Sequence, residues 1–182
     1  MQRISRPIQI LTDLTKQGRL FAAQNKFDER SFWEQNVPWG DIDSFQHVNN
    51  VKYLRYIESG RMKWLQELAI RAGGEQAAQQ LLAGRGIGLI LKKFDVDFKR
   101  PVTYPDTLLV AHKFLPKSAD PAHLLMHAII WSSAQQRVVT ESNANCVWYD
   151  YERLQKASQG PPASFAAVID ESIAGVPLEP AA

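Results

Sequence analysis

The sequence predicts a single α+β domain in which a curved antiparallel sheet wraps one long helix. The first observation is a stretch from about Asn49 to Leu68 whose apolar residues recur at helical spacing. The second is a series of four later stretches, beginning at Ile87, that are rich in β-branched and aromatic residues and separated by turn residues. The third is one more strand-like stretch, residues 32–39, ahead of the helix.

Length and composition agree with one globular domain. The chain has 182 residues, of which 45% are hydrophobic and 22% charged, so it can bury a core. The net charge is only +2 and basic residues occur in scattered pairs, which argues against a nucleic-acid partner. No stretch approaches the ~20 apolar residues of a membrane span. The single cysteine, Cys146, cannot form an internal disulfide and indicates a reducing compartment.

The central helix is the clearest element. Asn49 or Asn50 can cap its first turn. A second helical patch, residues 75–82, ends before Gly84 and Gly86. The apolar face of the central helix, which must be wide if a sheet is to surround it, comprises Val51, Tyr53, Leu54, Tyr56, Ile57, Met62, Trp64, Leu65 and Leu68.

Four strands are expected after the helix. They cover residues 87–99, 107–115, 124–132 and 138–149. Pro101 and Pro105 turn the chain between the first two, and a short polar connection near residues 135–136 joins the last two, so these strands form a meander.

Two terminal segments lie outside this domain. The first, an N-terminal extension at 1–30, has Arg3, Arg6, Lys16, Arg19 and Lys26 against the single acid Asp13, with Ile4, Ile8 and Leu11 at helical spacing. This composition suits either an amphipathic helix packed on the domain or a mitochondrial presequence, so the cytoplasm and the mitochondrial matrix both stay open. The second, a C-terminal tail at 161–182, is rich in Pro and Ala, with a short helix expected near residues 165–173.

The chemistry-bearing residues gather in the loop ahead of the central helix. Asp41, Asp43, His47, Asn49 and Asn50 fall within ten residues of one another. The first N–H groups of a helix lack internal partners and carry the positive end of the helix dipole, so they suit a developing oxyanion. Asp43 is placed to act as nucleophile or as the base that activates water, and His47 to orient it or to contact the substrate.

Capping alone is the competing interpretation of this loop, since Asp, Ser and Asn are the residues that helix starts select. The pair Asp41 and Asp43 also resembles part of a calcium loop, but the later ligands and the glycine of that pattern are missing. No metal and no cofactor are therefore expected.

The loop closely resembles the signature of the hotdog thioesterases of the 4-hydroxybenzoyl-CoA thioesterase type. In that family a strand ends in an aromatic residue and a DxD pair, and a short loop enters a long helix, as residues 39–43 (WGDID) and 51–54 (VKYL) do here. The resemblance covers roughly residues 32–150 and implies a hotdog domain at 31–160. It also implies that Asp43 is the catalytic aspartate and that protomers pair edge to edge as a homodimer or homotetramer.

Two related branches differ from this chain. Residues 46–51 (QHVNNV) resemble the motif of plant acyl-ACP thioesterases, whose proposed site has an asparagine where this chain has Phe45, so acyl carrier protein is less expected than CoA. The hydratase branch has its aspartate and histidine five positions apart with a proline between them. Asp43 and His47 are four apart and no proline intervenes.

The resemblance thus implies an acyl-CoA thioesterase of fatty acid metabolism, with a non-catalytic acyl-thioester-binding or structural hotdog protein as the alternative. The expected catalytic residues are Asp43, His47, Asn49 and Asn50. The expected substrate-binding residues are Phe45, Val48, Tyr53, Lys99 and Arg100, the last two for CoA phosphates.

Other polar residues receive structural interpretations. His112, His123 and His127 lack ligand spacing and are expected to be structural. Glu58 and Arg61, three apart on the helix, are expected to pair. Glu141, Ser142 and Asn143 either belong to an ordinary strand or approach the Asp43 of a neighbouring protomer.

Overall fold

The computed structural model describes residues 5–175, with side chains from residue 15 onward. Residues 1–4 and the side chains of residues 5–14 of the predicted extension, and residues 176–182 of the predicted tail, lie outside the described residues. The helices are α1 (Ser5–Gln24), α2 (Asn50–Leu82) and α3 (Ala163–Ala174), and two short 3-10 turns are η1 (Glu29–Ser31) and η2 (Trp39–Asp41).

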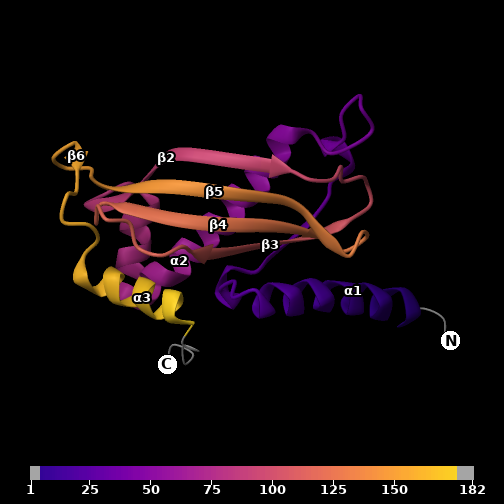
Figure 1. Cartoon of the computed structure of the whole chain (residues 1–182), viewed down its shortest axis with the longest axis horizontal. Helices are drawn as coiled ribbons and strands as arrows, with labels where there is room; N and C mark the ends of the chain where they lie inside the picture. Colours follow the sequence, from indigo (N-terminus) through magenta and orange to yellow (C-terminus); the bar gives the residue numbers. More distant parts are fainter. Residues whose placement is uncertain (1–4, 176–182) are drawn as a thin grey trace. The chain divides into compact units, whose positions relative to one another are not determined.

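The strands form one sheet. They are β1 (Trp33–Asn36), β2 (Ile87–Phe98), β3 (Thr107–Phe114), β4 (His123–Ser132), β5 (Arg137–Asp150) and β6 (Gln155–Lys156). The order across the sheet is β1-β3-β4-β5-β2, with β6 paired to β5 (Figure 1). The four long strands match the predicted stretches within one residue at each end. The predicted meander holds for β3, β4 and β5 but is wrong for β2, which lies next to β5 and not next to β3. Residues 99–106, which join β2 to β3, are longer than a tight hairpin turn and contain two prolines, so they do not force the two strands to pair.

The first strand is shorter than predicted. The expected strand at 32–39 ends at Asn36, and Trp39 begins η2 instead. Pro38 has no N–H to donate to a ladder, and the N–H of Val37 donates to the carbonyl of Asp106 outside any strand (3.0 Å).

The chain divides into two compact units. The first contains Met1–Gly60, Val96–His112 and Ala128–Glu141, and the second contains Arg61–Asp95, Lys113–His127 and Ser142–Ala182.

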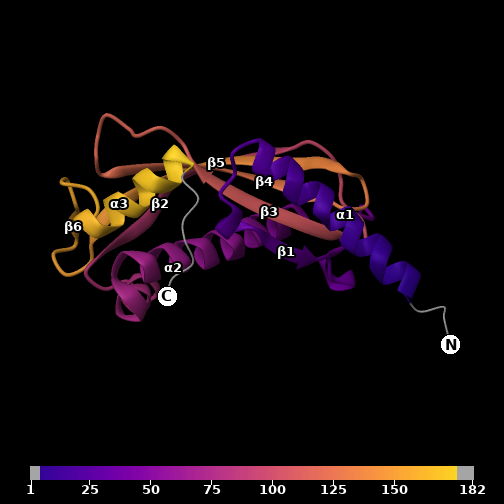
Figure 2. The ribbon, with the colours of Figure 1, turned by 90° about the horizontal axis from the view of Figure 1, so that it is seen from below.

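In the first unit, β3 is covered on both faces. A Cβ at Gly60 of α2 would lie 3.2 Å from both Val110 and His112, so the helix approaches this face closely. Successive side chains of a strand alternate between faces, and Leu109 and Ala111 therefore point to the other side. There they join an apolar cluster with α1 (Figure 2), made of Ala22, Phe27, Phe32, Leu109, Ala111, Ile129 and Trp131.

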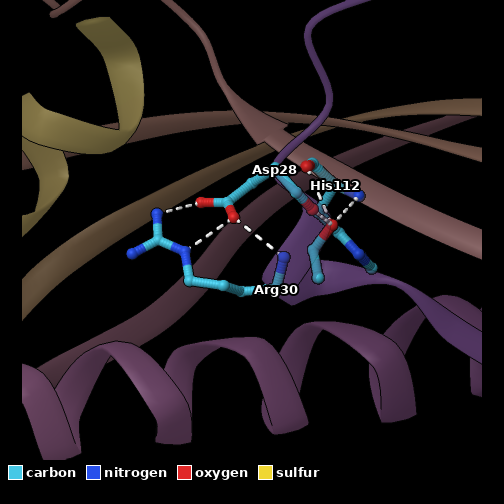
Figure 3. A network of polar contacts seen from close by, with 4 residues as sticks. Asp28, Arg30 and His112 are labelled. Atoms are coloured by element: carbon cyan, nitrogen blue, oxygen red, sulfur yellow. Dashed lines mark hydrogen bonds and ion pairs between the residues drawn. The ribbon is translucent and has the colours of Figure 1, made fainter. Parts of the chain in front are cut away.

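A polar network attaches η1 to β3 (Figure 3). The N–H of Asp28 donates to the carbonyl of His112 (2.9 Å), and the N–H of His112 donates to Ser31 Oγ (2.7 Å). The Asp28 carboxylate accepts from the N–H (3.0 Å) and Nε (2.7 Å) of Arg30. This network uses the backbone of His112, and its imidazole is buried.

In the second unit, α2 packs on the sheet through bulky side chains. The ring centroids of Trp64 and Phe114 are 4.4 Å apart, and those of Trp148 and Phe165 of α3 are 5.6 Å apart. The same cluster includes Cys146, where burial raises the pKa of the thiol to about 11.

Among residues 5–175, no helix has the length and apolarity needed to cross a membrane.

Helix α2 joins the two predicted helical patches through a break. Gly73 is extended (φ −167°) and Gly74 has φ 70° and ψ −171°, so neither is helical. The helix is kinked at this pair and resumes over the residues of the second predicted patch.

Candidate functional site

The loop between η2 and α2 folds as a small hairpin. Ile42 and Val48 form an antiparallel bridge, and the N–H of Asp43 donates to the carbonyl of His47 (3.0 Å). The N–H of Gln46 donates back to the carbonyl of Asp43 (3.0 Å), and Gln46 has φ 67°. A tight turn followed by one left-handed residue is a standard three-residue hairpin loop, which presents Asp43 and His47 side by side at its base.

Asp43 is held in place by its own loop. Its Oδ1 accepts from the N–H of Phe45 (2.9 Å) and its Oδ2 from the side-chain amide of Asn49 (3.4 Å). The side chain remains 21% exposed. The carboxylate is therefore fixed in orientation while still open to a small molecule.

Asn49 is the N-cap of α2. Its Oδ1 accepts from the N–H of Val51 (3.0 Å), and its own N–H donates to the carbonyl of Asp41 (2.9 Å). The predicted cap is confirmed, and the same side chain also contacts Asp43. Asn50 is exposed and begins the helix, in the turn whose N–H groups have no intrahelical partner.

His47 faces Asp43 without bonding to it. The distance from its Nδ1 to Asp43 Oδ1 is 4.0 Å, which is too long for a hydrogen bond. Its ring stacks on that of Phe45, with centroids 6.2 Å apart and planes 18° apart. Phe45 is 77% exposed, so this aromatic pair stands at the surface beside the carboxylate.

Asp41 forms a network that the sequence did not predict. Its carboxylate accepts a hydrogen bond from the hydroxyl of Tyr56 and pairs with Lys52 Nζ (2.8 Å). Burial by itself raises the pKa of Asp41, but the hydrogen bonds from Lys52 and Tyr56 outweigh it and lower that pKa. Lys52 and Tyr56 are four apart on α2, a spacing that puts both on one helix face and was the available signal.

Val48 and Tyr53, two expected substrate-binding residues, are buried. The N–H of Val48 donates to the carbonyl of Val102 (2.8 Å), and the hydroxyl of Tyr53 accepts from the N–H of Val102 (2.9 Å). Burial raises the pKa of Tyr53, whose ring also contacts Phe98 edge-on. Both residues therefore anchor the hairpin and the helix to the segment after β2.

Lys99 and Arg100, the expected phosphate-binding residues, differ in their surroundings. Lys99 Nζ donates to Asp97 (2.9 Å) and lies 3.6 Å from Glu141, and the Asp97 contact raises its pKa. The side chain of Arg100 is exposed and makes no ion pair with the described residues. No contact within the described part of the chain joins either cation to Asp43.

Three remaining polar candidates, Glu58, His123 and His127, have partners within their own unit. The expected pair of Glu58 and Arg61 is wrong, because Glu58 pairs with Arg55 instead (2.7 Å). His123 and His127 bond through Nδ1 to the side chains of Asn145 (2.8 Å) and Asn143 (3.0 Å). Among the residues described, no three His, Cys, Asp or Glu side chains are grouped so as to hold a metal ion.

Comparison with known proteins identifies a family. Residues 37–170 match the sequence model of the thioesterase-like superfamily. No curated protein matches the sequence.

Several solved structures share the fold. The PA2801 protein from Pseudomonas aeruginosa is 24% identical with a TM-score of 0.62, covering 76% of this chain and 96% of its own. The 1,4-dihydroxy-2-naphthoyl-CoA thioesterase Slr0204 from Synechocystis is 18% identical (TM-score 0.63; 77% and 95% covered). A thioesterase from Thermus thermophilus, solved with coenzyme A and Zn, is 20% identical (TM-score 0.60; 81% and 96% covered). The predicted hotdog architecture is confirmed.

Proposed function

Because the chain belongs to the thioesterase-like superfamily, we propose that it hydrolyses acyl-CoA thioesters to the free acid and CoA, with Asp43 as the catalytic carboxylate. The observation that carries this proposal is the setting of Asp43. Its carboxylate is oriented by Phe45 and Asn49 at the N-terminus of α2 and keeps a fifth of its surface open.

The proposed step uses Asp43 as a general base. The carboxylate takes a proton from a water molecule whose oxygen attacks the thioester carbonyl carbon. The carbon–sulfur bond then breaks, and the departing thiolate takes the proton from Asp43. Direct attack by Asp43 on the carbonyl, followed by hydrolysis of the resulting anhydride, gives the same products.

The other residues of the hairpin have supporting roles in this proposal. Asn50 is the first residue of α2. Its N–H suits the developing oxyanion, because the positive end of the helix dipole lies there. Asn49 holds Asp43 and caps the helix. His47, 4.0 Å from Asp43, is placed to donate a hydrogen bond to the substrate or to the water.

CoA is the proposed carrier. The Thermus thermophilus thioesterase was solved with coenzyme A, and the phosphates of that molecule call for a cation on the protein. Arg100 is the better candidate, because Lys99 is already engaged by Asp97 and Glu141. Phe45 presents an exposed ring for contact with the ligand. Val48 and Tyr53 are buried, so they support the hairpin and do not contact the ligand directly.

A homo-oligomer is the proposed assembly. β2 ends the strand order at one side of the sheet and is twelve residues long. Its side chains include four exposed hydrophobic residues, namely Ile87, Ile90, Leu91 and Phe98. A long apolar edge strand invites pairing with a second copy.

One observation favours a non-catalytic acyl-thioester-binding protein as the second candidate. Both oxygens of Asp43 already accept hydrogen bonds from its own loop, as they would in a purely structural turn.

The test is thiol release from short, medium, long and aromatic acyl-CoAs by the purified protein and its Asp43→Asn variant. Removing a general base lowers turnover by about 10²- to 10⁴-fold, so release by the variant is expected to fall by at least about 10²-fold. Asparagine keeps one oxygen for the Phe45 N–H, so the fold is expected to persist and circular dichroism checks it.

Ser44→Ala is the matched control, because Ser44 is exposed in the same hairpin and makes no side-chain hydrogen bond with the described residues. Turnover by this variant is expected to equal that of the unchanged protein. A folded protein that releases no thiol from any of these esters would replace the hydrolase with the non-catalytic candidate.

A further inference from the structure

Arg61 of α2 is a buried cation without a counter-charge. Only 7% of its surface is exposed. Among the described residues it has no ion pair and no hydrogen bond, and its Cζ lies over the ring of Phe94, 5.8 Å from the ring centroid. Glu58, the acid three residues earlier, pairs with Arg55.

This arrangement is costly in the isolated chain. A guanidinium is always protonated, so it cannot lose its charge as a buried lysine can. Its five N–H donors have lost most of their water, and no acceptor of the described chain replaces it.

The guanidinium group is nevertheless not fully enclosed. None of its nitrogens belongs to the fully enclosed side-chain atoms without a partner, so each keeps some accessible surface. The guanidinium lies beside an apolar ring, that of Phe94. Phe94 in turn packs against the buried cluster that contains Cys146. Burial, the larger effect, raises the pKa of Cys146 to about 11, and the charge of Arg61 acts in the opposite direction.

We propose that Arg61 is an anion-binding residue that takes an organic carboxylate. A carboxylate matches the planar pair of guanidinium donors and compensates the charge. The Phe94 ring and the apolar cluster of this unit favour a carboxylate carried on an aromatic or alkyl group over a small, strongly hydrated inorganic anion. The inference goes beyond the proposed function, and binding is measured without turnover.

The test compares benzoate and hexanoate binding to the full chain and to its Arg61→Met variant by NMR titration at low salt. Both carboxylates are expected to bind the unchanged protein, and the variant to lose about 10- to 100-fold in affinity, the range for a charge-assisted hydrogen-bonded pair. Benzamide, which has the shape of benzoate without its charge, is expected to bind both proteins equally weakly. Arg55→Met, at an exposed arginine of the same helix, is expected to leave benzoate binding unchanged.

The thermal stability of Arg61→Met is expected to change in the opposite direction to its carboxylate affinity. Because methionine replaces an uncompensated buried charge with an apolar chain of similar length, the melting temperature without ligand is expected to rise by roughly 2–10 °C. Higher stability together with lost carboxylate binding would distinguish a binding residue from a structural one.

Equal benzoate affinity in the two proteins, or no binding to either, would overturn the proposal. So would an Arg61→Met variant that fails to fold, since that would mean the guanidinium has a structural partner. A variant with a smaller assembly mass and unchanged carboxylate binding would assign the counter-charge to a second copy of the chain instead.

Discussion

Asp41 illustrates how one side chain can set the geometry of a candidate site without belonging to it. Its backbone carbonyl accepts from the N–H of Asn49, and its carboxylate accepts from Tyr56 and Lys52 on the first turns of α2. Asn49 in turn bonds to Asp43. The hairpin that carries Asp43 is thus attached to the helix on both sides of its turn.

We expect Asp41→Asn to lower the free energy of unfolding by about 1–3 kcal/mol at pH 7, the range for hydrogen bonds to a charged group. The folded-state pKa of Asp41 lies below its ordinary value of 3.8, so the ionised carboxyl stabilises the fold above that pH. This stabilisation is lost as the pH falls through the lower folded-state pKa. The difference between the two proteins should therefore shrink when urea unfolding is repeated below pH 3.8.

Tyr56→Phe removes the hydroxyl donor and keeps the ring, so it serves as the matched variant for the same network. It should also lower stability at pH 7, with a smaller effect in acid. An Asp41→Asn difference that stays constant from about pH 7 to about pH 3 would mean that the charge of Asp41 contributes nothing.

At the scale of elements, α2 is defined as much by its break as by its apolar face. Its residues up to Ala72 pack on the sheet within each unit, and Gly73 and Gly74 interrupt the helix before it resumes. The conformation of Gly74 lies in a backbone region that is essentially restricted to glycine. The helical spacing before and after the glycine pair therefore belongs to two helical segments, and the glycine pair determines the angle between them.

Gly74→Ala is expected to lower the free energy of unfolding by about 1–3 kcal/mol, because a side chain at φ 70° and ψ −171° is strained even though the space around it is open. Urea unfolding followed by circular dichroism measures the change. Gly40→Ala is the control, since its Cβ would also meet nothing within 4 Å and its φ is not positive. If both variants were equally stable, the break would not depend on glycine.

At the scale of the whole molecule, the edge strand β2 connects the fold to its proposed assembly. The other end of the strand order, β1, is only four residues long, and β2 is twelve. Short edge strands limit unwanted pairing, and long apolar ones permit it.

Leu91→Lys is expected to shift the protein toward the monomer, because a charge on an apolar edge opposes pairing with a second copy. Light scattering after size-exclusion chromatography measures the mass at equal concentration. Leu82→Lys, at a comparably exposed leucine at the end of α2, should keep the mass of the unchanged protein. An unchanged protein that is already monomeric would contradict the proposed assembly.

Much of the fold could be predicted because its signals are local. Period-two stretches located four strands within one residue at each end, and helical spacing located both parts of α2. The strand at 32–39 was predicted too long because aromatic and β-branched residues continue past Asn36, while the backbone hydrogen bonds that make a strand do not. The position of Asp43 before a helix start was also readable from the chain, although its catalytic role stays a proposal.

By itself the sequence determined the order and type of the elements, the N-cap at Asn49 and the group of polar residues before α2, because each depends on neighbours a few positions apart. Only the tertiary structure decided which of these residues meet. In the folded chain Asp41 accepts a hydrogen bond from Tyr56, and Val48 and Tyr53 are buried against Val102. Glu58 pairs with Arg55, so Arg61 is buried without an acidic partner. Such pairings depend on how the helix and the strands pack, and this packing cannot be read from the spacing of residues a few positions apart in the sequence.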